Sequence, residues 1–196
     1  MDKQKIAAFF NSIAATWDAN ERPGVYNTAQ IIIDKIAPQP ASKILDIGCG
    51  TGVLYPFLQA YNPSETLHVD LSENMLAEFC KKHPKAAVLC ADFETARLKK
   101  NYFDYIIAYN VFPHFIDKQK VFDNAFSFLK QGGSFYIVHS MTREELQRVH
   151  GSNSQTEEDL LPPSAAMELM YLNAGFKNIV IEEKSPGFYS FGIKPA

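Results

Sequence analysis

The sequence predicts an α/β domain, a three-layer sandwich in which helices cover both faces of a mostly parallel β-sheet. Two observations carry this prediction. Short apolar segments alternate along the chain with segments of helical periodicity, the order that builds a parallel sheet with helical crossovers. The chain has 196 residues, which suits one such domain and leaves little room for a second. We therefore expect residues 1–196 to form a single domain.

The strand and helix patterns follow one another along the whole chain. Strands are predicted for residues 43–47, 66–69, 86–90, 102–109, 134–139, 178–184 and 188–194. Helices are predicted within residues 3–20, 26–36, 54–58, 73–83, 121–129, 143–150 and 165–173. Pro38 and Pro84 follow two of these helices, which they cannot continue. The turn sequence Ser185-Pro186-Gly187 joins the last two strands into a hairpin.

Composition narrows the classes of function. Hydrophobic residues make up 46% of the chain and charged residues 21%, and no apolar run approaches the roughly 18 residues of a membrane span. No apolar segment follows the charged N-terminus, so we expect no signal peptide and no membrane partner. The net charge of −3 argues against nucleic acid as a partner. Three cysteines without Cys-x-x-Cys spacing fit a reducing, cytoplasmic compartment.

A glycine-rich turn follows the first strand, and its spacing limits the ligand it can hold. Gly48, Gly50 and Gly52 stand at alternate positions before a helical pattern, a corner suited to a nucleotide-like ligand. A dinucleotide fingerprint requires glycine or alanine where Val53 stands, which disfavours NAD. No Gly-Lys-Ser/Thr sequence follows these glycines, which disfavours ATP.

With Asp46 before the first glycine, this segment resembles motif I of class I S-adenosylmethionine-dependent methyltransferases. The resemblance implies a Rossmann-like fold with a seven-stranded sheet and an antiparallel last strand. It implies S-adenosylmethionine as the cofactor and S-adenosylhomocysteine as the product. The residues of this motif that it assigns to cofactor binding are Asp46, Gly48, Cys49, Gly50 and Gly52.

Acidic residues also end the second and third strands. Asp70 is placed to accept hydrogen bonds from both ribose hydroxyls, as acids at this position of nucleotide-binding sheets do. The alternative for Asp70 is a helix cap, a role that Ser72 could fill instead. Leu71 and Met75 would flank the adenine by resemblance.

Asp92 and Phe93 follow the third strand. By resemblance, Asp92 accepts a hydrogen bond from the adenine amino group and the Phe93 main-chain N–H reaches a ring nitrogen. The alternative for Asp92 is an ordinary turn aspartate. Asn110, which opens the segment after the fourth strand, joins the cofactor-binding residues by the same resemblance. With Asp46 and Asp70, Asp92 places an acid at the carboxyl ends of three successive strands, where open α/β sheets bind ligands.

Two segments are predicted to cover the site. Residues 9–18 resemble the opening segment of quinone-biosynthesis-type methyltransferases, which helps to cover the cofactor, and we expect this role for residues 1–38. The alternative is a helix that merely packs on the domain. Residues 140–163 form a connection that is long for a plain connector, and we expect it to cover the substrate.

Three histidines fall on the ligand-binding end of the predicted sheet and are candidates for a catalytic base: His114, His139 and His150. The alternative for each is an ordinary polar or capping histidine. Together with Glu157, Glu158 and Asp159 they could also form a metal site, but their spacing matches no ligand motif, and we predict no metal. Four aromatic residues are candidates for lining an apolar acceptor pocket: Tyr26, Tyr109, Phe112 and Phe115.

The predicted function is methyl transfer from S-adenosylmethionine to a small-molecule acceptor. Positioning for in-line displacement would carry the reaction, with a histidine removing a proton where the acceptor requires it. The alternative is a non-catalytic S-adenosylmethionine- or S-adenosylhomocysteine-binding sensor or scaffold, since binding residues do not establish turnover. The acceptor and the oligomeric state do not follow from the sequence.

Overall fold

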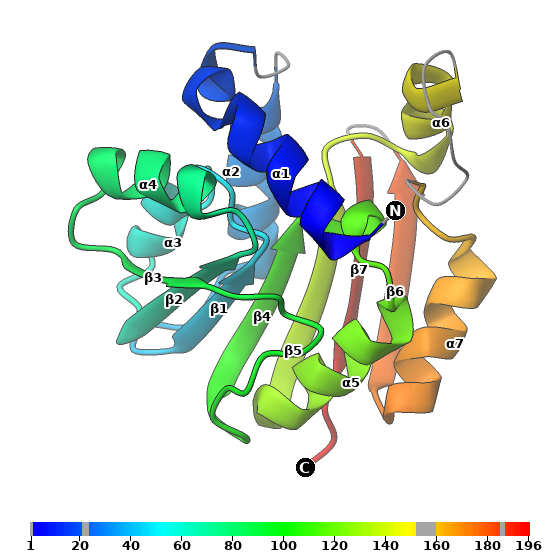
Figure 1. The fold of residues 1–196 in the computed structure, drawn as a ribbon. Coiled ribbons are helices and arrows are strands. Elements are labelled where there is room, and N and C mark those ends of the chain that lie inside the picture. The colour runs from blue at the N-terminus through cyan, green and yellow to red at the C-terminus, as the bar shows by residue number, and fades with distance from the viewer. Residues whose placement is uncertain (1, 21–23, 152–159, 185–186) are drawn as a thin grey trace.

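The computed structural model describes all residues except 1, 21–23, 152–159 and 185–186. Seven strands form one sheet with helices packed on both faces (Figure 1). The strands are β1 (Lys43–Ile47), β2 (Glu65–Asp70), β3 (Ala87–Cys90), β4 (Phe103–Tyr109), β5 (Leu129–His139), β6 (Lys177–Lys184) and β7 (Gly187–Ile193). The α-helices are α1 (Lys3–Ile13), α2 (Val25–Ile36), α3 (Tyr55–Gln59), α4 (Glu73–Lys82), α5 (Lys118–Phe128), α6 (Arg143–Gly151) and α7 (Ser164–Ala174). The predicted α/β sandwich is confirmed.

The strand order is β3-β2-β1-β4-β5-β7-β6. Neighbours from β3 to β5 run parallel, whereas β7 runs antiparallel to both β5 and β6. The predicted antiparallel last strand is therefore confirmed. The order reverses at β1, which lies between β2 and β4, and ligands of open α/β sheets bind in the crevice at such a reversal.

Successive residues of the central strands enter different cores on the two faces of the sheet. Ile107 packs with Ile33 of α2 and Leu58 of α3 on one face, and all three side chains are buried. Ile106 packs with Phe122 of α5 and Tyr171 of α7 on the other face. Burial on both faces explains why β4 reads as a nearly continuous apolar run.

The N-terminal helix is shorter than predicted. Residues 3–20 form α1 followed by two 3₁₀ turns, η1 (Ala14–Thr16) and η2 (Asp18–Asn20). Near the end of α1, the Ser12 hydroxyl donates to the Phe9 carbonyl, and the Thr16 hydroxyl donates to the Ile13 carbonyl. Such side-chain bonds compete with the helical pattern and favour tighter turns. Apolar spacing alone did not reveal this competition.

Strand β5 begins five residues earlier than predicted. Leu129 pairs with Phe103 of β4, and the main chain of Gly132 and Gly133 hydrogen-bonds to Lys194, just after β7. Pairing with distant segments thus keeps the glycine-containing stretch in the sheet. Ser185 and Pro186 of the predicted hairpin turn lie outside the described residues. None of the described helices combines the length and the apolar character needed to cross a membrane.

Candidate functional site

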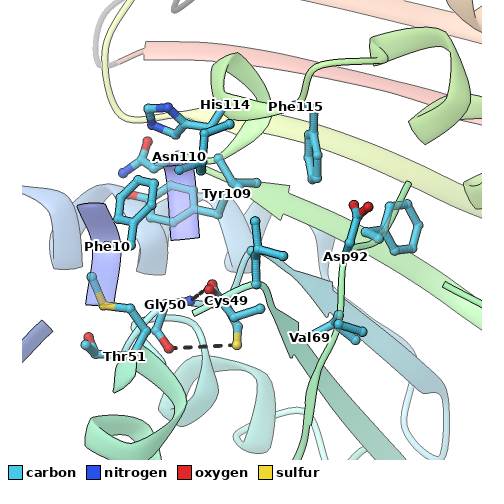
Figure 2. Close-up of a pocket in the computed structure, with 18 of the residues that line it drawn as sticks. Phe10, Cys49, Gly50, Thr51, Val69, Asp92, Tyr109, Asn110, His114 and Phe115 are labelled. Carbon is cyan, nitrogen blue, oxygen red and sulfur yellow. Dashed lines mark hydrogen bonds between the residues drawn. The ribbon is translucent and has the colours of Figure 1, made fainter. Parts of the chain in front are cut away.

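A pocket lies at the carboxyl ends of the central strands, under the N-terminal helix (Figure 2). Figure 1 shows α1 lying across the end of the sheet toward which β4 points. Four loops and the N-terminal segment line this pocket. The predicted cofactor residues among its lining are Gly48, Cys49, Gly50, Asp70, Leu71, Met75, Asp92, Phe93 and Asn110. The topology therefore brings most of the predicted residues to one place.

The three glycines of the first loop differ in what their surroundings allow. All three have positive φ angles, of 64° at Gly48, 53° at Gly50 and 91° at Gly52. A Cβ atom on Gly48 would lie 2.1 Å from Val111 Cγ2, and one on Gly52 would lie 2.6 Å from the ring of Phe79. A Cβ atom on Gly50 would meet no atom within 4 Å. Packing therefore requires Gly48 and Gly52, whereas Gly50 leaves open space beside the pocket.

Asp70 ties the glycine loop to the end of β2. Its Oδ2 accepts a hydrogen bond from the Gly50 N–H and its Oδ1 accepts one from the Ser72 N–H, both at 2.8 Å. Ser72 itself caps α4, because its Oγ accepts from the Met75 N–H at 3.1 Å. Burial raises the pKa of Asp70, and the main-chain hydrogen bonds only partly offset this effect. A carboxylate accepts about four hydrogen bonds, so acceptor positions remain for a ligand.

Asp92 lies in the turn after β3 beside a second acid, Glu94. Asp92 Oδ1 accepts from the Glu94 N–H at 3.0 Å, and its Oδ2 accepts from Thr95 Oγ1 at 3.0 Å. Lys3 Nζ of α1 donates to Asp92 Oδ2 and lies 3.0 Å from Glu94 Oε2. Burial alone would lower the pKa of the Lys3 ammonium, but its hydrogen bonds to the two acids outweigh burial and raise it.

Glu94 is a pocket residue that the sequence analysis did not identify. Its carboxylate is buried and accepts hydrogen bonds from the Ile116 and Asp117 N–H groups, at 2.9 and 3.0 Å. It thus joins the turn after β3 to the loop before α5. Its position two residues after Asp92 could have identified Glu94 in the sequence, because a pair of acids at a strand end suits a polar ligand.

Asp46 and Gly52 do not line the pocket, although both were predicted to bind the cofactor. Asp46 is buried, and its Oδ2 lies 3.0 Å from Nδ1 of the buried His68. The Phe79 ring packs against His68, with 4.9 Å between ring centroids, and it also fills the space beside Gly52. These residues form the packing beneath the glycine loop and support its shape.

Two of the three predicted catalytic histidines have described side chains, and these two lie in different surroundings. His114 lines the pocket, where its ring packs edge-on against Phe10 with 5.2 Å between centroids. His139 is buried outside the lining, and its Nδ1 accepts a hydrogen bond from the Met141 N–H at 3.1 Å. His150 belongs to α6, but its side chain is not among those described. Figure 2 shows His114 beside Asn110 and away from Asp92.

Of the other residues predicted for the site, some line the pocket and others do not. Tyr109 and Phe115 line the pocket, whereas Phe112 is buried in the core and Tyr26 is exposed. Residues 157–159, the acidic part of the possible metal site, lie outside the described residues. In the part of the chain that the structure describes, no group of three or more His, Cys, Asp or Glu side chains could hold a metal ion.

Asn110 holds the ends of two strands together. Its φ of 54° lies in the left-handed region that asparagine tolerates, and its Oδ1 accepts a hydrogen bond from the Ser140 N–H at 2.7 Å. Lys3 and Ile6, from the segment predicted to cover the cofactor, also line the pocket, as do residues that the sequence did not single out for the site: Thr51, Val69, Ala91, Glu94 and Val111.

The strand order and the glycine loop with acids at the adjacent strand ends form the arrangement expected of an α/β domain of the methyltransferase type. Residues 45–137 match the family model described as a methyltransferase domain. The resemblance to class I S-adenosylmethionine-dependent methyltransferases that the sequence motifs predicted is confirmed by this match.

Curated relatives carry this domain within longer proteins. The phosphoethanolamine N-methyltransferase 1 of Triticum aestivum is 26% identical over 175 residues, which cover 84% of this chain and 34% of the relative. The malonyl-[acyl-carrier protein] O-methyltransferase of Bacillus cereus is 27% identical over 165 residues, covering 81% of this chain and 61% of the relative. The chain thus spans about a third of the wheat protein.

Solved structures share the fold at low sequence identity. Phosphoethanolamine N-methyltransferase 2 of Haemonchus contortus, in complex with S-adenosyl-L-methionine, superposes with a TM-score of 0.75 at 18% identity, covering 100% of this chain and 58% of that one. An S-adenosylmethionine-dependent methyltransferase from Mesorhizobium loti has a TM-score of 0.70 at 17% identity, covering 86% of this chain and 98% of that one.

Proposed function

We propose that this protein binds S-adenosylmethionine and transfers its methyl group to a small-molecule acceptor. The observation that carries the proposal is the juxtaposition of Gly50, Asp70 and Asp92 around one pocket at the reversal of strand order. Open space beside Gly50 and remaining acceptor positions on Asp70 fit a nucleoside whose ribose lies against the end of β2.

The same residues argue for this cofactor over a dinucleotide. Asp70 would accept hydrogen bonds from the ribose hydroxyls, and Asp92 would accept one from the adenine amino group. Leu71 and Met75, which lie between Asp70 and Asp92 in the sequence, also line the pocket. Their side chains would offer apolar contacts to the two faces of the adenine ring. Val53, which stands where a dinucleotide fingerprint has glycine or alanine, also lines the pocket and narrows it for a pyrophosphate.

The bound cofactor supplies a methyl group already activated by its sulfonium charge, so this chain chiefly has to orient the acceptor. Enforced in-line geometry can lower a barrier by about 7–11 kcal/mol. Phe10, Tyr109 and Phe115 give the pocket aromatic walls that exclude water from the reaction. Among the predicted histidines with described side chains, His114 lines the pocket, and we assign to it the removal of a proton from a hydroxyl or amine acceptor.

Calorimetry with S-adenosylhomocysteine and NAD tests cofactor choice. Wild-type protein is expected to bind S-adenosylhomocysteine and not NAD. Asp70→Ala should weaken this binding by roughly 1.5–3 kcal/mol, the range for hydrogen bonds to a charged group. Asp123→Ala, on the exposed side of α5, is the control and should bind as the wild type does. NAD binding without S-adenosylhomocysteine binding would refute the proposal.

Methyl transfer itself needs an acceptor, and the names of the relatives suggest where to begin. Phosphoethanolamine and small carboxylic acids are the first acceptors to test with labelled S-adenosylmethionine. With an amine acceptor such as phosphoethanolamine, His114→Ala should lower the transfer rate while leaving S-adenosylhomocysteine affinity unchanged, because the acids that hold the nucleoside follow β2 and β3. Transfer to a carboxylic acid should change little, because that acceptor is already ionised at neutral pH. His139→Ala and His150→Ala complete the comparison of the three predicted bases. Cofactor binding without transfer to any acceptor would favour the sensor or scaffold alternative.

A further inference from the structure

The N-terminal segment is attached to each of the three loops that would hold the nucleoside. Lys3 contacts Asp92 and Glu94 after β3. Asn11 Oδ1 accepts a hydrogen bond from Ser72 Oγ at 2.6 Å, after β2. Asp18 Oδ1 accepts one from Thr51 Oγ1 at 2.5 Å, in the glycine loop. These three attachments bind α1 and the turns after it to the rim of the pocket.

Of these three attachments, the one through Lys3 joins full charges; away from the three loops, Asp18 also pairs with Lys82 of α4, at 2.6 Å. The Lys3 side chain is 31% exposed, and its partners Asp92 and Glu94 are 20% and 5% exposed. Lys5, two residues further along α1, is 76% exposed and lies 3.8 Å from Asp2, a contact away from the pocket. Exposed pairs contribute little, whereas hydrogen bonds between partly buried charges contribute more. Lys3 is therefore the charged link between α1 and the pocket, and Lys5 is its natural comparison.

The acid pair can serve Lys3 and a nucleoside at the same time. Asp92 accepts the Glu94 N–H at Oδ1, and Thr95 Oγ1 and Lys3 at Oδ2, which leaves an acceptor position on Oδ1. Glu94 offers Lys3 a second carboxylate at 3.0 Å. An adenine amino group can therefore bind Asp92 while the Lys3 ammonium remains between the two acids.

We propose that Lys3 is a positioning residue that fastens α1 over the bound nucleoside and thereby controls how fast the cofactor leaves. The inference rests on the proposed function, because it takes Asp92 as the acceptor for adenine. Ile6, Phe10 and Trp17 of the same segment line the pocket, so movement of the segment away from the sheet would open this side of it for the nucleoside to leave. Movement of α1 requires the Lys3 contacts to break, and their loss should speed release.

Release can be followed with a reporter that the chain already contains. Trp17 is the only tryptophan, lines the pocket and packs against Phe10 with 5.8 Å between ring centroids. Its fluorescence should change when S-adenosylhomocysteine binds and recover when the ligand leaves. Stopped-flow dilution of the complex then measures the dissociation rate in wild type, Lys3→Met, Lys3→Arg and Lys5→Met.

Lys3→Met should raise the dissociation rate about three- to tenfold. This is the effect expected when a charge-assisted hydrogen bond is lost whose strength is reduced by partial exposure to solvent. Lys3→Arg should restore most of the wild-type rate, and Lys5→Met should leave it unchanged. Added salt should speed release more in the wild type than in Lys3→Met, because the variant lacks the Lys3 contact, whereas both proteins keep the Asp18–Lys82 ion pair of 2.6 Å. A merely structural role for Lys3 would not produce this salt dependence.

Equal dissociation rates for Lys3→Met and Lys5→Met would overturn the inference. Tighter binding by Lys3→Met would also overturn it, because Lys3 would then compete with the adenine amino group. Amide hydrogen exchange without ligand separates this inference from the proposed function. Faster exchange in α1 of Lys3→Met, relative to Lys5→Met, would support the fastening contact, and equal exchange would refute it whether or not a cofactor binds. Absence of S-adenosylhomocysteine binding in the wild type would instead refute the proposed function.

Discussion

Asp70 combines two requirements that act against each other. Its carboxylate has to be ionised to accept main-chain and ribose hydrogen bonds, yet it is partly buried and lies near a fully buried acid, Asp46. Burial raises its pKa above the ordinary 3.8, with a smaller contribution from the Asp46 charge. The Gly50 and Ser72 N–H groups stabilise the ionised form. Keeping the Asp70 carboxylate ionised therefore costs electrostatic free energy, which these hydrogen bonds partly offset.

This balance predicts how cofactor affinity depends on pH. Lowering the pH through the raised pKa protonates Asp70 and removes its acceptor function, so S-adenosylhomocysteine affinity should begin to fall at a higher pH than for an ordinary aspartate. Binding favours the carboxylate and should therefore release protons in the same range. Calorimetry from about pH 8 to about pH 4.5 in two buffers of different ionisation enthalpy measures both effects.

Asp70→Asn should bind weakly and lose this part of the pH dependence. Circular dichroism at each pH confirms that the protein remains folded. A wild-type affinity that stays constant to the pH of acid unfolding would contradict the prediction.

The glycine loop between β1 and α3 shows how one element separates packing from ligand binding. Gly52 has a φ of 91° and faces the ring of Phe79, which is fully buried. Gly50 also has a positive φ, but its α-carbon faces open space beside the pocket. A methyl group on Gly52 would clash with the Phe79 ring. A methyl group on Gly50 would enter the space where we propose that the cofactor lies.

The two alanine substitutions in this loop should therefore have different consequences. Gly52→Ala should destabilise the protein by roughly 2–4 kcal/mol, from left-handed backbone strain and overpacking together. Gly50→Ala should cost about 1–2 kcal/mol from strain alone but should weaken S-adenosylhomocysteine binding. Urea unfolding and calorimetry on both variants measure the contrast. Equal stabilities, or wild-type affinity in Gly50→Ala, would show that the assignment of the two glycines is wrong.

At the scale of the whole molecule, four loops and the N-terminal segment line the pocket in which we propose that the cofactor binds. A ligand that binds the folded state alone stabilises it by about 2.7 kcal/mol at a hundred times its dissociation constant. For a domain of this size, that free energy corresponds to a rise in melting temperature of roughly 5–11 °C.

Thermal unfolding with S-adenosylhomocysteine at that ratio should show this rise, and NAD at the same concentration should produce none. Asp70→Ala at the wild-type ligand concentration should show a much smaller shift. A rise of equal size with NAD would contradict the expected selectivity, and no rise with either ligand would indicate that neither binds the folded protein.

Local patterns along the chain were sufficient for the order and type of its elements. The apolar run of β4 and the spacing of Gly48, Gly50 and Gly52 depend on chain neighbours, and parallel strands bring their carboxyl ends to one edge. The fold, and the gathering of Asp70 and Asp92 at one pocket, therefore followed from the sequence.

Contacts between distant segments could be read only from the tertiary structure. The placement of Lys3 on Asp92 and Glu94 joins residues about ninety positions apart, and no periodicity relates them. The pairing of Asp46 with His68 depends on the register of β1 against β2, which places these two residues side by side. His114 follows β4 and His139 is the last residue of β5, and only the packing of their side chains decided that one lines the pocket and the other is buried. Side-chain direction depends on register and packing, and these are properties of the assembled sheet.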